Sequence, residues 1–348
     1  MELSVIVPTY NERDNIVTLL ERVESSLKGR RFELIVVDDN SPDGTADVAY
    51  KASERYGNVK VIRRPAKLGL GSAVTEGARV AKANVLAVMD ADLQHPPELL
   101  PKMLDKINEG FDIVVASRYI RGGGIEGWGL WRRLVSRVAI ALAKLALPRV
   151  RGFKDSMSGF FMFKRGVIDG VELKPKGFKV LLEILVKGKW NAATELPYMF
   201  KPRLKGKSKL NTKEVYSYIK YLLELSSYRP IKFAAVGASG IVVNEGLLHL
   251  LIHFIPLQVA GALAIETSVL SNFILNNYWT FKDRKEGGIL SKCLRYHGAV
   301  AIGALVNYVV LLSLVAFLGM HYLIANLIGI FLGFLANYSV SELFVWRS

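Results

Sequence analysis

The stretch Val85–Pro97 reads VLAVMDADLQHPP. A short apolar run of this kind predicts a buried strand of a parallel sheet, because both faces of such a strand are covered. The run ends in two carboxylates, Asp90 and Asp92, and the Pro-Pro pair that follows stops regular structure. Ligands of open α/β sheets bind at the carboxyl ends of the strands. We therefore expect Asp90 and Asp92 to lie at a ligand site.

Two neighbouring carboxylates repel each other unless a cation or a hydrogen-bond donor neutralises them. Mg²⁺ prefers one or two carboxylates and fills its other positions with water and phosphate oxygens. Asp90 and Asp92 therefore suggest a divalent metal that holds a diphosphate. The alternative is a polar turn that caps a helix starting near Glu98.

Hydropathy divides the 348 residues into two parts, as expected for about two domains. From Ile231 onward the chain is largely apolar, and soluble helices seldom stay apolar on all sides over such lengths. We expect a first domain at 1–210, an amphipathic interface helix or linker at 211–229, and a four-span transmembrane domain at 230–348. The four stretches long enough to cross a bilayer are Ile231–Phe254, Leu257–Thr280, Tyr296–Leu318 and Tyr322–Trp346.

The placement of basic residues predicts an orientation in the membrane. The chain opens with an apolar strand instead of a basic segment before an apolar one, so we expect no signal peptide and a cytoplasmic first domain. The connections near Pro256 and Met320 carry no Lys or Arg, unlike the connection from Phe281 to Arg295. The positive-inside rule predicts a multi-pass protein of the cell membrane with both termini in the cytoplasm. The basic residues of that connection are Lys282, Arg284, Lys285, Lys292 and Arg295.

The formal net charge of +15 favours anionic partners. No recognition module or stacking pattern accompanies the charge, so we expect no nucleic acid. Anionic lipid headgroups and a phosphate-bearing substrate are the simpler partners. The single cysteine, Cys293, excludes an intrachain disulfide.

Three more strands precede Val85, at Leu3–Val7, Phe32–Val37 and Val59–Arg63, and each is followed by a helical pattern. Four strand–helix units in succession predict an α/β fold with a mostly parallel sheet. The first βα turn holds no G-x-G-x-x-G, which disfavours a dinucleotide site.

The ends of the first two strands carry residues that suit a nucleotide. Pro8 and Tyr10 offer a rigid edge and a flat ring, which suit a nucleobase. Acidic residues at the end of the second strand, Asp39 among them, can accept hydrogen bonds from base N–H groups or ribose hydroxyls.

Two groups of motifs carry a family resemblance. The strand-end motifs are Pro8–Glu12, Val37–Thr45 and Asp90–Pro97. The motifs that follow are Ser117-Arg118-Tyr119, Gly122-Gly123-Gly124, Gly127-Trp128, Arg132-Arg133-x-x-Ser136-Arg137, Asp155-x-x-Ser158-Gly159-Phe160 and Arg203-x-x-Gly206-x-Ser208-Lys209-Leu210. The first group resembles the GT-A family 2 glycosyltransferases, and the second closely resembles the polyprenyl-phosphate sugar synthases, above all the dolichyl-phosphate mannose synthase family. The resemblance covers residues 3–225 and departs from the family at Asp155–Gly159, where Asp-Leu-Thr-Gly is common.

The resemblance implies a GT-A (Rossmann-like) domain with three groups of site residues. Asp90, Asp92 and Gln94 would be catalytic and would hold Mg²⁺ or Mn²⁺. Arg118, Arg132 and Ser136 would bind the lipid phosphate. The nucleotide sugar would contact Pro8, Tyr10, Glu12, Val37, Asp39, Asp90, Ala91, Asp92, Lys179 and Arg203, the last as a clamp on the leaving diphosphate.

Two stretches have the amphipathic pattern of interface helices, Leu130–Leu147 and Lys213–Ser226. In the apolar half, Phe233–Asn244 resembles Tyr296–Asn307, which suggests two similar hairpins like those of GtrA-type domains. Gly329-x-x-x-Gly333 permits close helix approach. We expect this half to act as an anchor, with a flippase-like role as the alternative.

The reaction that the resemblance implies is a metal-dependent, inverting transfer of mannose from GDP-mannose to dolichyl or another polyprenyl phosphate. The second pKa of such a phosphate is about 6, so near pH 7 the acceptor is already largely a dianion and needs no general base. The alternatives are a synthase that uses UDP-glucose and a non-catalytic membrane protein. A processive polysaccharide synthase is disfavoured, because neither Gln94 nor Gln258 begins a Gln-x-x-Arg-Trp motif.

Overall fold

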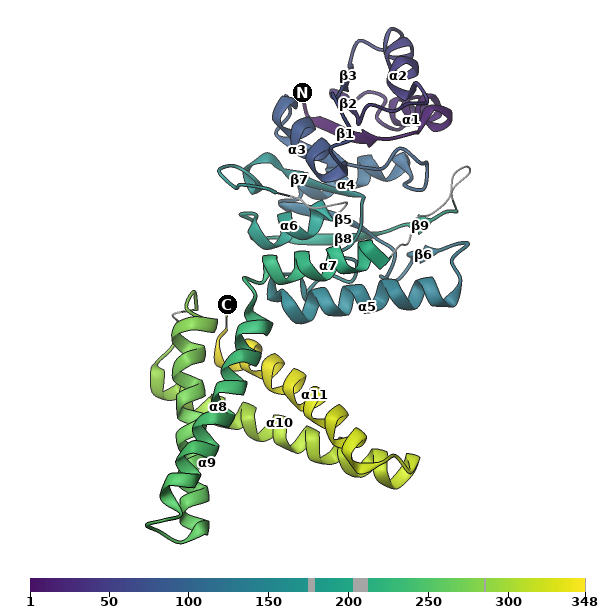
Figure 1. Cartoon of the computed structure of the whole chain (residues 1–348). Coiled ribbons are helices and arrows are strands. Elements are labelled where there is room, and N and C mark those ends of the chain that lie inside the picture. Colours follow the sequence, from purple (N-terminus) through teal and green to yellow (C-terminus); the bar gives the residue numbers. More distant parts are fainter. Residues whose placement is uncertain (175–178, 203–211, 285, 348) are drawn as a thin grey trace. The chain divides into compact units, whose positions relative to one another are not determined.

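The computed structural model describes residues 1–174, 179–202, 212–284 and 286–347, and it divides into two compact units, Met1–Tyr221 and Leu222–Ser348 (Figure 1). Arg203 and Lys285, which the sequence analysis singled out, lie outside the described residues. The two units are described separately.

The N-terminal unit is built on a seven-stranded sheet in the order β3-β2-β1-β4-β7-β5-β8. Its pairs are parallel except at β7, which runs antiparallel to both β4 and β5. The predicted mostly parallel α/β fold is therefore confirmed. The strands are β1 (Leu3–Thr9), β2 (Phe32–Asp38), β3 (Val59–Arg63), β4 (Val85–Val88), β5 (Ile113–Ser117), β7 (Phe161–Lys164) and β8 (Ala193–Pro197). A second, two-stranded sheet pairs β6 (Gly124–Ile125) with β9 (Met199–Phe200).

Both faces of the sheet are covered, which explains the nearly continuous apolar strands. On one face, Val5 and Val7 of β1 belong to the same buried cluster as Leu19 of α1. On the other face, Gly77 of α3 lies so close to Ile6 and Val37 that a Cβ would overlap the Ile6 side chain. The helices are α1 (Arg13–Ser26), α2 (Thr45–Ser53), α3 (Leu70–Val80), α4 (Leu100–Asn108) and α6 (Val180–Lys187), with short 3₁₀ turns at Pro97–Leu99, Pro148–Val150 and Arg165–Val167.

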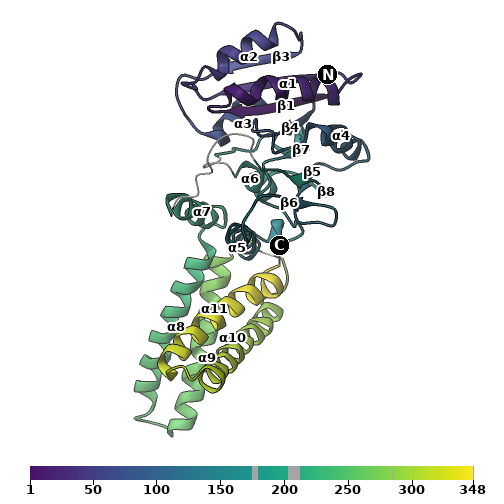
Figure 2. The same cartoon turned by 90° about the vertical axis from the view of Figure 1, so that its right-hand side faces the viewer.

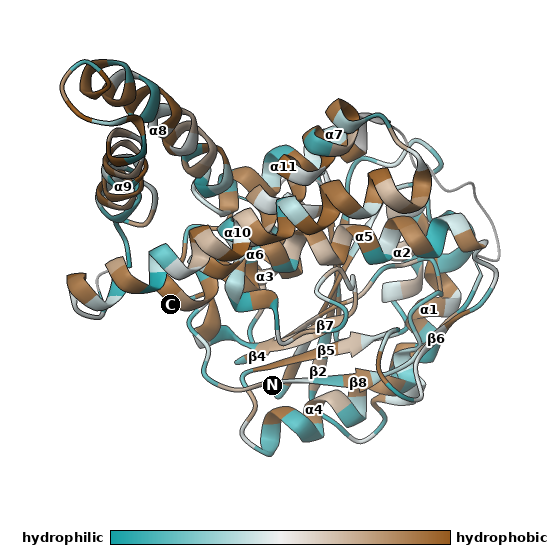
Figure 3. Cartoon of the chain, turned by 90° about the horizontal axis from the view of Figure 1, so that it is seen from below, coloured by the Kyte–Doolittle hydropathy of each residue, from teal (hydrophilic) through white to brown (hydrophobic). Residues whose placement is uncertain are grey.

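The two predicted amphipathic helices are present as α5 (Leu130–Ala146) and α7 (Thr212–Leu225). Helix α5 buries Ile140, Ala143 and Ala146, whereas its apolar residues Leu130, Trp131, Leu134, Val138 and Leu142 are exposed. Figure 3 shows hydrophobic stretches along α5 that alternate with hydrophilic ones. An exposed apolar stripe on a helix that also carries arginines is typical of a membrane interface.

The C-terminal unit contains four helices long and apolar enough to cross a membrane, as predicted. They pair as two hairpins, α8 with α9 and α10 with α11 (Figure 2). The third helix begins at Ile289 and not at Tyr296, so Lys292 and Arg295 lie in its first turns and not in the preceding loop as expected. The helices are α8 (Arg229–Leu251), α9 (Leu257–Leu275) with a π-helical end at Asn276–Thr280, α10 (Ile289–Leu318), and α11 (Tyr322–Val340) with a π-helical end at Ser341–Val345.

The two hairpins repeat one packing contact. In the first, Gly240 of α8 lies directly against the Asn272 side chain of α9, and in the second Gly303 of α10 lies against Asn337 of α11. Gly333 packs against the backbone of Gly303, which places the predicted close helix approach between α10 and α11. The missing side chains let the two backbones of each hairpin come together.

Candidate active site

A cleft of about 1210 Å³ opens at the carboxyl ends of β1, β2 and β4 and continues between α5 and α7. Its first part is polar, and its second part is lined by apolar residues such as Leu134, Val138 and Ile219. The structure therefore brings most of the predicted site residues into one cavity. Those that line it are Pro8, Tyr10, Glu12, Asp39, Asp90, Ala91, Asp92, Gln94, Arg118, Arg132, Ser136 and Lys179.

The loop that follows β4 is held by its own polar groups. His95 is buried and stacks on Phe160, and its Nδ1 accepts a hydrogen bond from the backbone N–H of Asp90 at 3.0 Å. Asp92 Oδ1 accepts from the N–H of Gln94 at 3.2 Å. Gln94 Nε2 donates to the carbonyl of Lys201 at 2.6 Å, which ties this loop to the chain beyond β9. These bonds fix where the two carboxylates stand.

The residues at the cap positions of the helices that follow are Pro96 and Leu99, not Asp90 or Asp92. The 3₁₀ turn Pro97–Leu99 and helix α4 that follow have no side-chain cap hydrogen bond. Asp90 instead lies against Gly159, where a Cβ would come within 2.9 Å of Asp90 Oδ2. The glycine leaves space at the carboxylate that any larger residue would fill.

The donor set of this loop fits a hard divalent cation. Asp90, Asp92 and Gln94 all line the open cleft. Within the described part of the chain, no three His, Cys, Asp or Glu side chains gather into a metal cage of their own. Mg²⁺ needs only one or two carboxylates when phosphate and water complete its shell. The two carboxylates are thus suited to a metal that arrives with a diphosphate.

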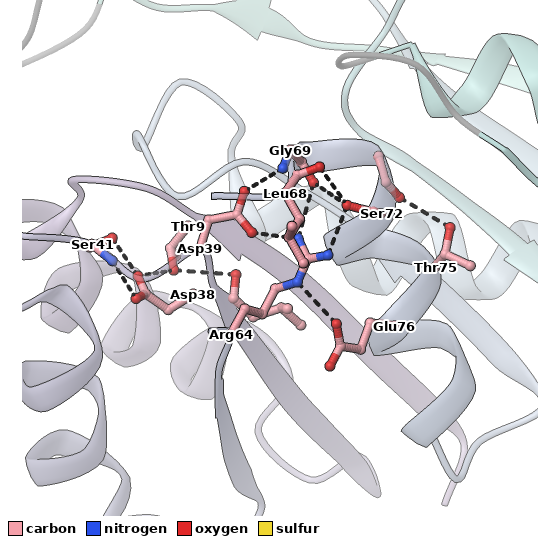
Figure 4. A network of polar contacts seen from close by, with 12 residues as sticks. Thr9, Asp38, Asp39, Ser41, Arg64, Leu68, Gly69, Ser72, Thr75 and Glu76 are labelled. Atoms are coloured by element: carbon pink, nitrogen blue, oxygen red, sulfur yellow. Dashed lines mark hydrogen bonds and ion pairs between the residues drawn. The ribbon is translucent and has the colours of Figure 1, made fainter. Parts of the chain in front are cut away.

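Asp39, at the end of β2, is fixed by a polar network that the sequence analysis missed (Figure 4). Its carboxylate pairs with the buried guanidinium of Arg64 and accepts from the N–H of Gly69 at 2.7 Å. Arg64 also donates to Ser72 Oγ at 2.8 Å and pairs with Glu76 at 3.0 Å. Asp39 is therefore a rigid acceptor at the edge of the cleft.

The Tyr10 ring lies in the cleft with the ammonium of Lys67 3.6 Å from its centroid. Glu12 is fixed beside it, because its N–H donates to Thr45 Oγ1 at 2.9 Å and its carboxylate accepts from Asn15 Nδ2 at 2.7 Å. Val37 does not join this group. Its side chain is buried beneath Gly77 and does not line the cleft, because neighbouring strand residues point to opposite faces.

Asp43 also lines the cleft and anchors the start of α2. Burial by itself would raise the pKa of its carboxyl group, but hydrogen bonds from the Thr45 hydroxyl and from the N–H groups of Arg13 and Thr45 outweigh it, so the pKa is lowered.

The three residues expected at the acceptor phosphate are brought together around two aromatic rings. The guanidinium of Arg132 lies 4.1 Å from the ring centre of Trp128, and that of Arg118 lies 5.6 Å from the same centre. Tyr119 donates its hydroxyl to Ser136 Oγ at 2.8 Å. The cluster thus combines residues from the end of β5 and from the first turns of α5.

Arg118 is nearly buried, and its Nε and Nη2 groups donate to the two oxygens of Asp155 at 2.7 and 2.8 Å. Burial alone would lower the pKa of this guanidinium, but the Asp155 carboxylate more than offsets it and raises the pKa above its ordinary value. The Nη1 edge of Arg118 is the part that the Asp155 pair does not use.

Lys179 lines the cleft at the start of α6, with its ammonium 6.0 Å from the ring centre of Tyr218. Tyr218 of α7 donates its hydroxyl to the carbonyl of Ala139 in α5 at 2.7 Å, so the two helices are joined across the cleft. Burial raises the pKa of Tyr218, and the hydroxyl remains a donor at neutral pH.

Comparison with known proteins defines the class. The family model of glycosyl transferase family 2 matches residues 4–171, and that of the GtrA/DPMS transmembrane domain matches residues 232–346. The crystal structure of glucosyl-3-phosphoglycerate synthase from Mycobacterium tuberculosis, in complex with Mn²⁺, UDP-glucose and phosphoglyceric acid, has a similar fold. Its TM-score is 0.51 at 20% identity, over 65% of this chain and 80% of that one. The protein is a GT-A glycosyltransferase joined to a transmembrane domain.

Individual relatives narrow this class. The dolichol-phosphate mannosyltransferase of Pyrococcus furiosus is 47% identical over the whole of both chains. The enzyme of the same name from Saccharomyces cerevisiae is 33% identical over 74% of this chain and 97% of its own. The chain belongs to the dolichol-phosphate mannosyltransferase family.

Proposed function

We propose that the protein transfers mannose from GDP-mannose to dolichyl or another polyprenyl phosphate at the cell membrane, with inversion at the anomeric carbon. The observation that carries this proposal is the continuous cleft. It leads from the carboxylates of Asp90 and Asp92, past the Arg118–Arg132–Ser136 cluster, to the apolar walls formed by α5 and α7. A nucleotide sugar suits its polar part and a phosphate with an apolar chain suits the rest.

On the donor side, Pro8, Tyr10, Glu12 and Asp39 form an edge for the nucleoside. Asp90, Asp92 and Gln94 would hold Mg²⁺ or Mn²⁺ at the diphosphate, with Ala91 beside them, and a bound metal of this kind stabilises the charge that develops on the leaving nucleoside diphosphate. Lys179 would add a positive charge near the same phosphates, as would Arg203, which lies outside the described residues. The name of the Mycobacterium tuberculosis structure, which includes Mn²⁺ and a nucleotide sugar, supports divalent metal use in this fold.

On the acceptor side, Arg118, Arg132 and Ser136 would orient the lipid phosphate. One phosphate oxygen forms the new bond to the anomeric carbon on the face opposite the diphosphate, while the bond from that carbon to the diphosphate breaks. The phosphate is largely a dianion near pH 7, so no side chain has to remove a proton. The contribution of this cluster is therefore orientation of two bound substrates.

The predicted test is the Asp92→Ala variant of the full-length protein. We expect transfer of labelled mannose to polyprenyl phosphate to be lost, because a carboxylate that serves the donor diphosphate is gone, while the melting temperature changes little. Transfer by this variant at a rate near that of wild type, or wild-type activity that persists in excess chelator, would refute the proposed role.

The names of the curated relatives favour mannose, whereas a UDP-glucose donor remains the second candidate from the fold neighbour. Binding of GDP-mannose and of UDP-glucose, each measured with Mn²⁺, separates the two. A purely flippase-like protein is the candidate from another class, and it predicts no transfer with either donor.

A further inference from the structure

Asp155 belongs to a motif of the family resemblance, yet the proposed reaction gives it no task. Its side chain has no exposed surface, and its carboxylate receives three N–H groups of a single residue, Arg118. The distances are 3.0 Å from the backbone N–H, 2.7 Å from Nε and 2.8 Å from Nη2. The N–H of Asp155 in turn donates to Glu195 Oε1 on β8 at 2.9 Å.

A buried carboxylate is costly unless it is fully paired, and well-packed apolar residues often serve stability equally well. The value of this pair is therefore geometric. A guanidinium held by two parallel N–H···O bonds has its plane and direction fixed. The aromatic rings of Trp128 and Phe200, with centroids 5.6 and 5.4 Å from the Arg118 guanidinium carbon, limit its movement further.

The turn that contains Asp155 also contacts Asp90, a carboxylate of the proposed donor site. Ser158 donates its N–H to the carbonyl of Asp155 at 3.2 Å, and the next residue, Gly159, lies against Asp90 and His95. Residues 155–159 therefore connect the arginine of the acceptor cluster with a carboxylate of the donor site through five residues of one turn.

We propose that Asp155 is a positioning residue that holds the Arg118 guanidinium in the orientation required by the acceptor phosphate. The inference rests on the proposed function, which assigns Arg118 to that phosphate. Asp155 touches no substrate and acts only through Arg118, so its effect should disappear when Arg118 is removed.

The test is a double-mutant cycle on the full-length protein in lipid nanodiscs, with Asp155→Asn, Arg118→Ala and the combined variant. We expect Asp155→Asn to raise the KM for polyprenyl phosphate at least 10-fold and to leave the Kd of GDP-mannose with Mn²⁺ within 2-fold. The combined variant should be no worse than Arg118→Ala in acceptor KM. Its melting temperature should be higher than that of Arg118→Ala, which leaves a buried carboxylate unpaired.

The matched control is Asp112→Asn. Asp112 also pairs with a basic residue, Lys164 at 3.0 Å, and accepts the N–H groups of Asn191 and Ala192, but it does not line the cleft. It should change the melting temperature without changing the acceptor KM. An acceptor KM within 2-fold of wild type in Asp155→Asn, or effects of the two single variants that multiply in the combined one, overturns the proposal.

If Asp155→Asn does not fold, Arg118→Lys tests the same point, because a lysine keeps the charge but cannot make the two parallel bonds. Acceptor use like that of wild type in Arg118→Lys overturns the proposal, and a raised acceptor KM with unchanged donor affinity supports it. Wild-type protein that ignores polyprenyl phosphate but glycosylates another acceptor refutes the proposed function alone. The double-mutant cycle is then run with that acceptor. If the effects of Asp155→Asn and Arg118→Ala on its KM are independent, the role of Asp155 is refuted.

Discussion

At the scale of single residues, the close approach of Gly159 to the carboxylate of Asp90 leads to a specific prediction. An alanine there would place its Cβ 2.9 Å from Asp90 Oδ2 and 3.2 Å from His95 Cε1. Because His95 is buried and holds the Asp90 backbone, the carboxylate is the group that must move. We expect Gly159→Ala to weaken metal-dependent binding of GDP-mannose at least 10-fold, measured by titration calorimetry with Mn²⁺.

Gly152 provides the control for this variant, since a Cβ there meets no atom within 4 Å. Gly152→Ala should bind the donor as wild type does. Equal loss of donor affinity in both variants would show that Gly159 has no special relation to Asp90.

Asp43 predicts a pH dependence of stability. The pKa of its carboxyl group is lowered in the folded protein from the ordinary value of 3.8. The hydrogen bonds that the carboxylate accepts therefore stabilise the fold above that pH, and this stabilisation is lost as the pH falls through the folded-state pKa. Asp43→Asn should therefore have a lower melting temperature than wild type at pH 7, and the difference should shrink below about pH 3.8. A difference that is constant between pH 7 and pH 3 would contradict this account.

The sequence was a good guide to residues whose position follows from a strand end. Asp90 and Asp92 could be placed because ligand sites of α/β sheets lie there. The partners of these residues could not, since Arg64 reaches Asp39, and Lys67 reaches Tyr10, only after three strands have paired. Val37 was predicted to contact the nucleotide, but its side chain is buried and does not line the cleft. A shift by one residue along a strand reverses the face to which a side chain points, so a motif alone does not tell which of its side chains face the cleft.

At the scale of elements, the sequence predicts the first four strands well because apolar residues make up most of each strand. The position of β7 between β4 and β5, and its antiparallel direction, depend on tertiary packing and could not be predicted from the local sequence. The start of α10 was misplaced because Lys292 and Arg295 suggest a loop, whereas Lys292 is buried in the helix and donates to the carbonyl of Arg284 at 3.0 Å.

The hairpin α10–α11 predicts opposite effects for two glycine substitutions in one helix. A Cβ at Gly303 would lie 2.9 Å from both the Gly333 carbonyl and Asn337 Cβ, so Gly303→Ala should lower the melting temperature in detergent. A Cβ added at Gly298 would meet no neighbouring atom within 4 Å. Gly298→Ala should raise the stability slightly, by about 0.5–1 kcal/mol, because alanine favours the helix. The same sign for both variants would contradict close packing at Gly303.

At the scale of the whole molecule, sequence and structure agree on a glycosyltransferase unit followed by four membrane-spanning helices. The boundaries at 210 and 229 stay predictions, and so does the orientation. Basic residues decide the orientation through their cost of translocation, which a structure of the chain alone does not contain.

The orientation can be measured with cysteines, because the chain has a single one, Cys293. Both test variants are made in a Cys293→Ser background. Glu286→Cys places a thiol in the connection between α9 and α10, which also carries the basic residues Lys282 and Arg284. Met320→Cys places a thiol in the connection between α10 and α11, which carries no Lys or Arg. With the N-terminal unit in the cytoplasm, a membrane-impermeant maleimide should label Met320→Cys on intact cells and Glu286→Cys only after permeabilisation. Labelling of Glu286→Cys on intact cells would put the glycosyltransferase unit outside. The glycosyltransferase unit would then be separated from a cytoplasmic supply of nucleotide sugar. The same result would therefore contradict both the predicted orientation of the helices and the proposed donor.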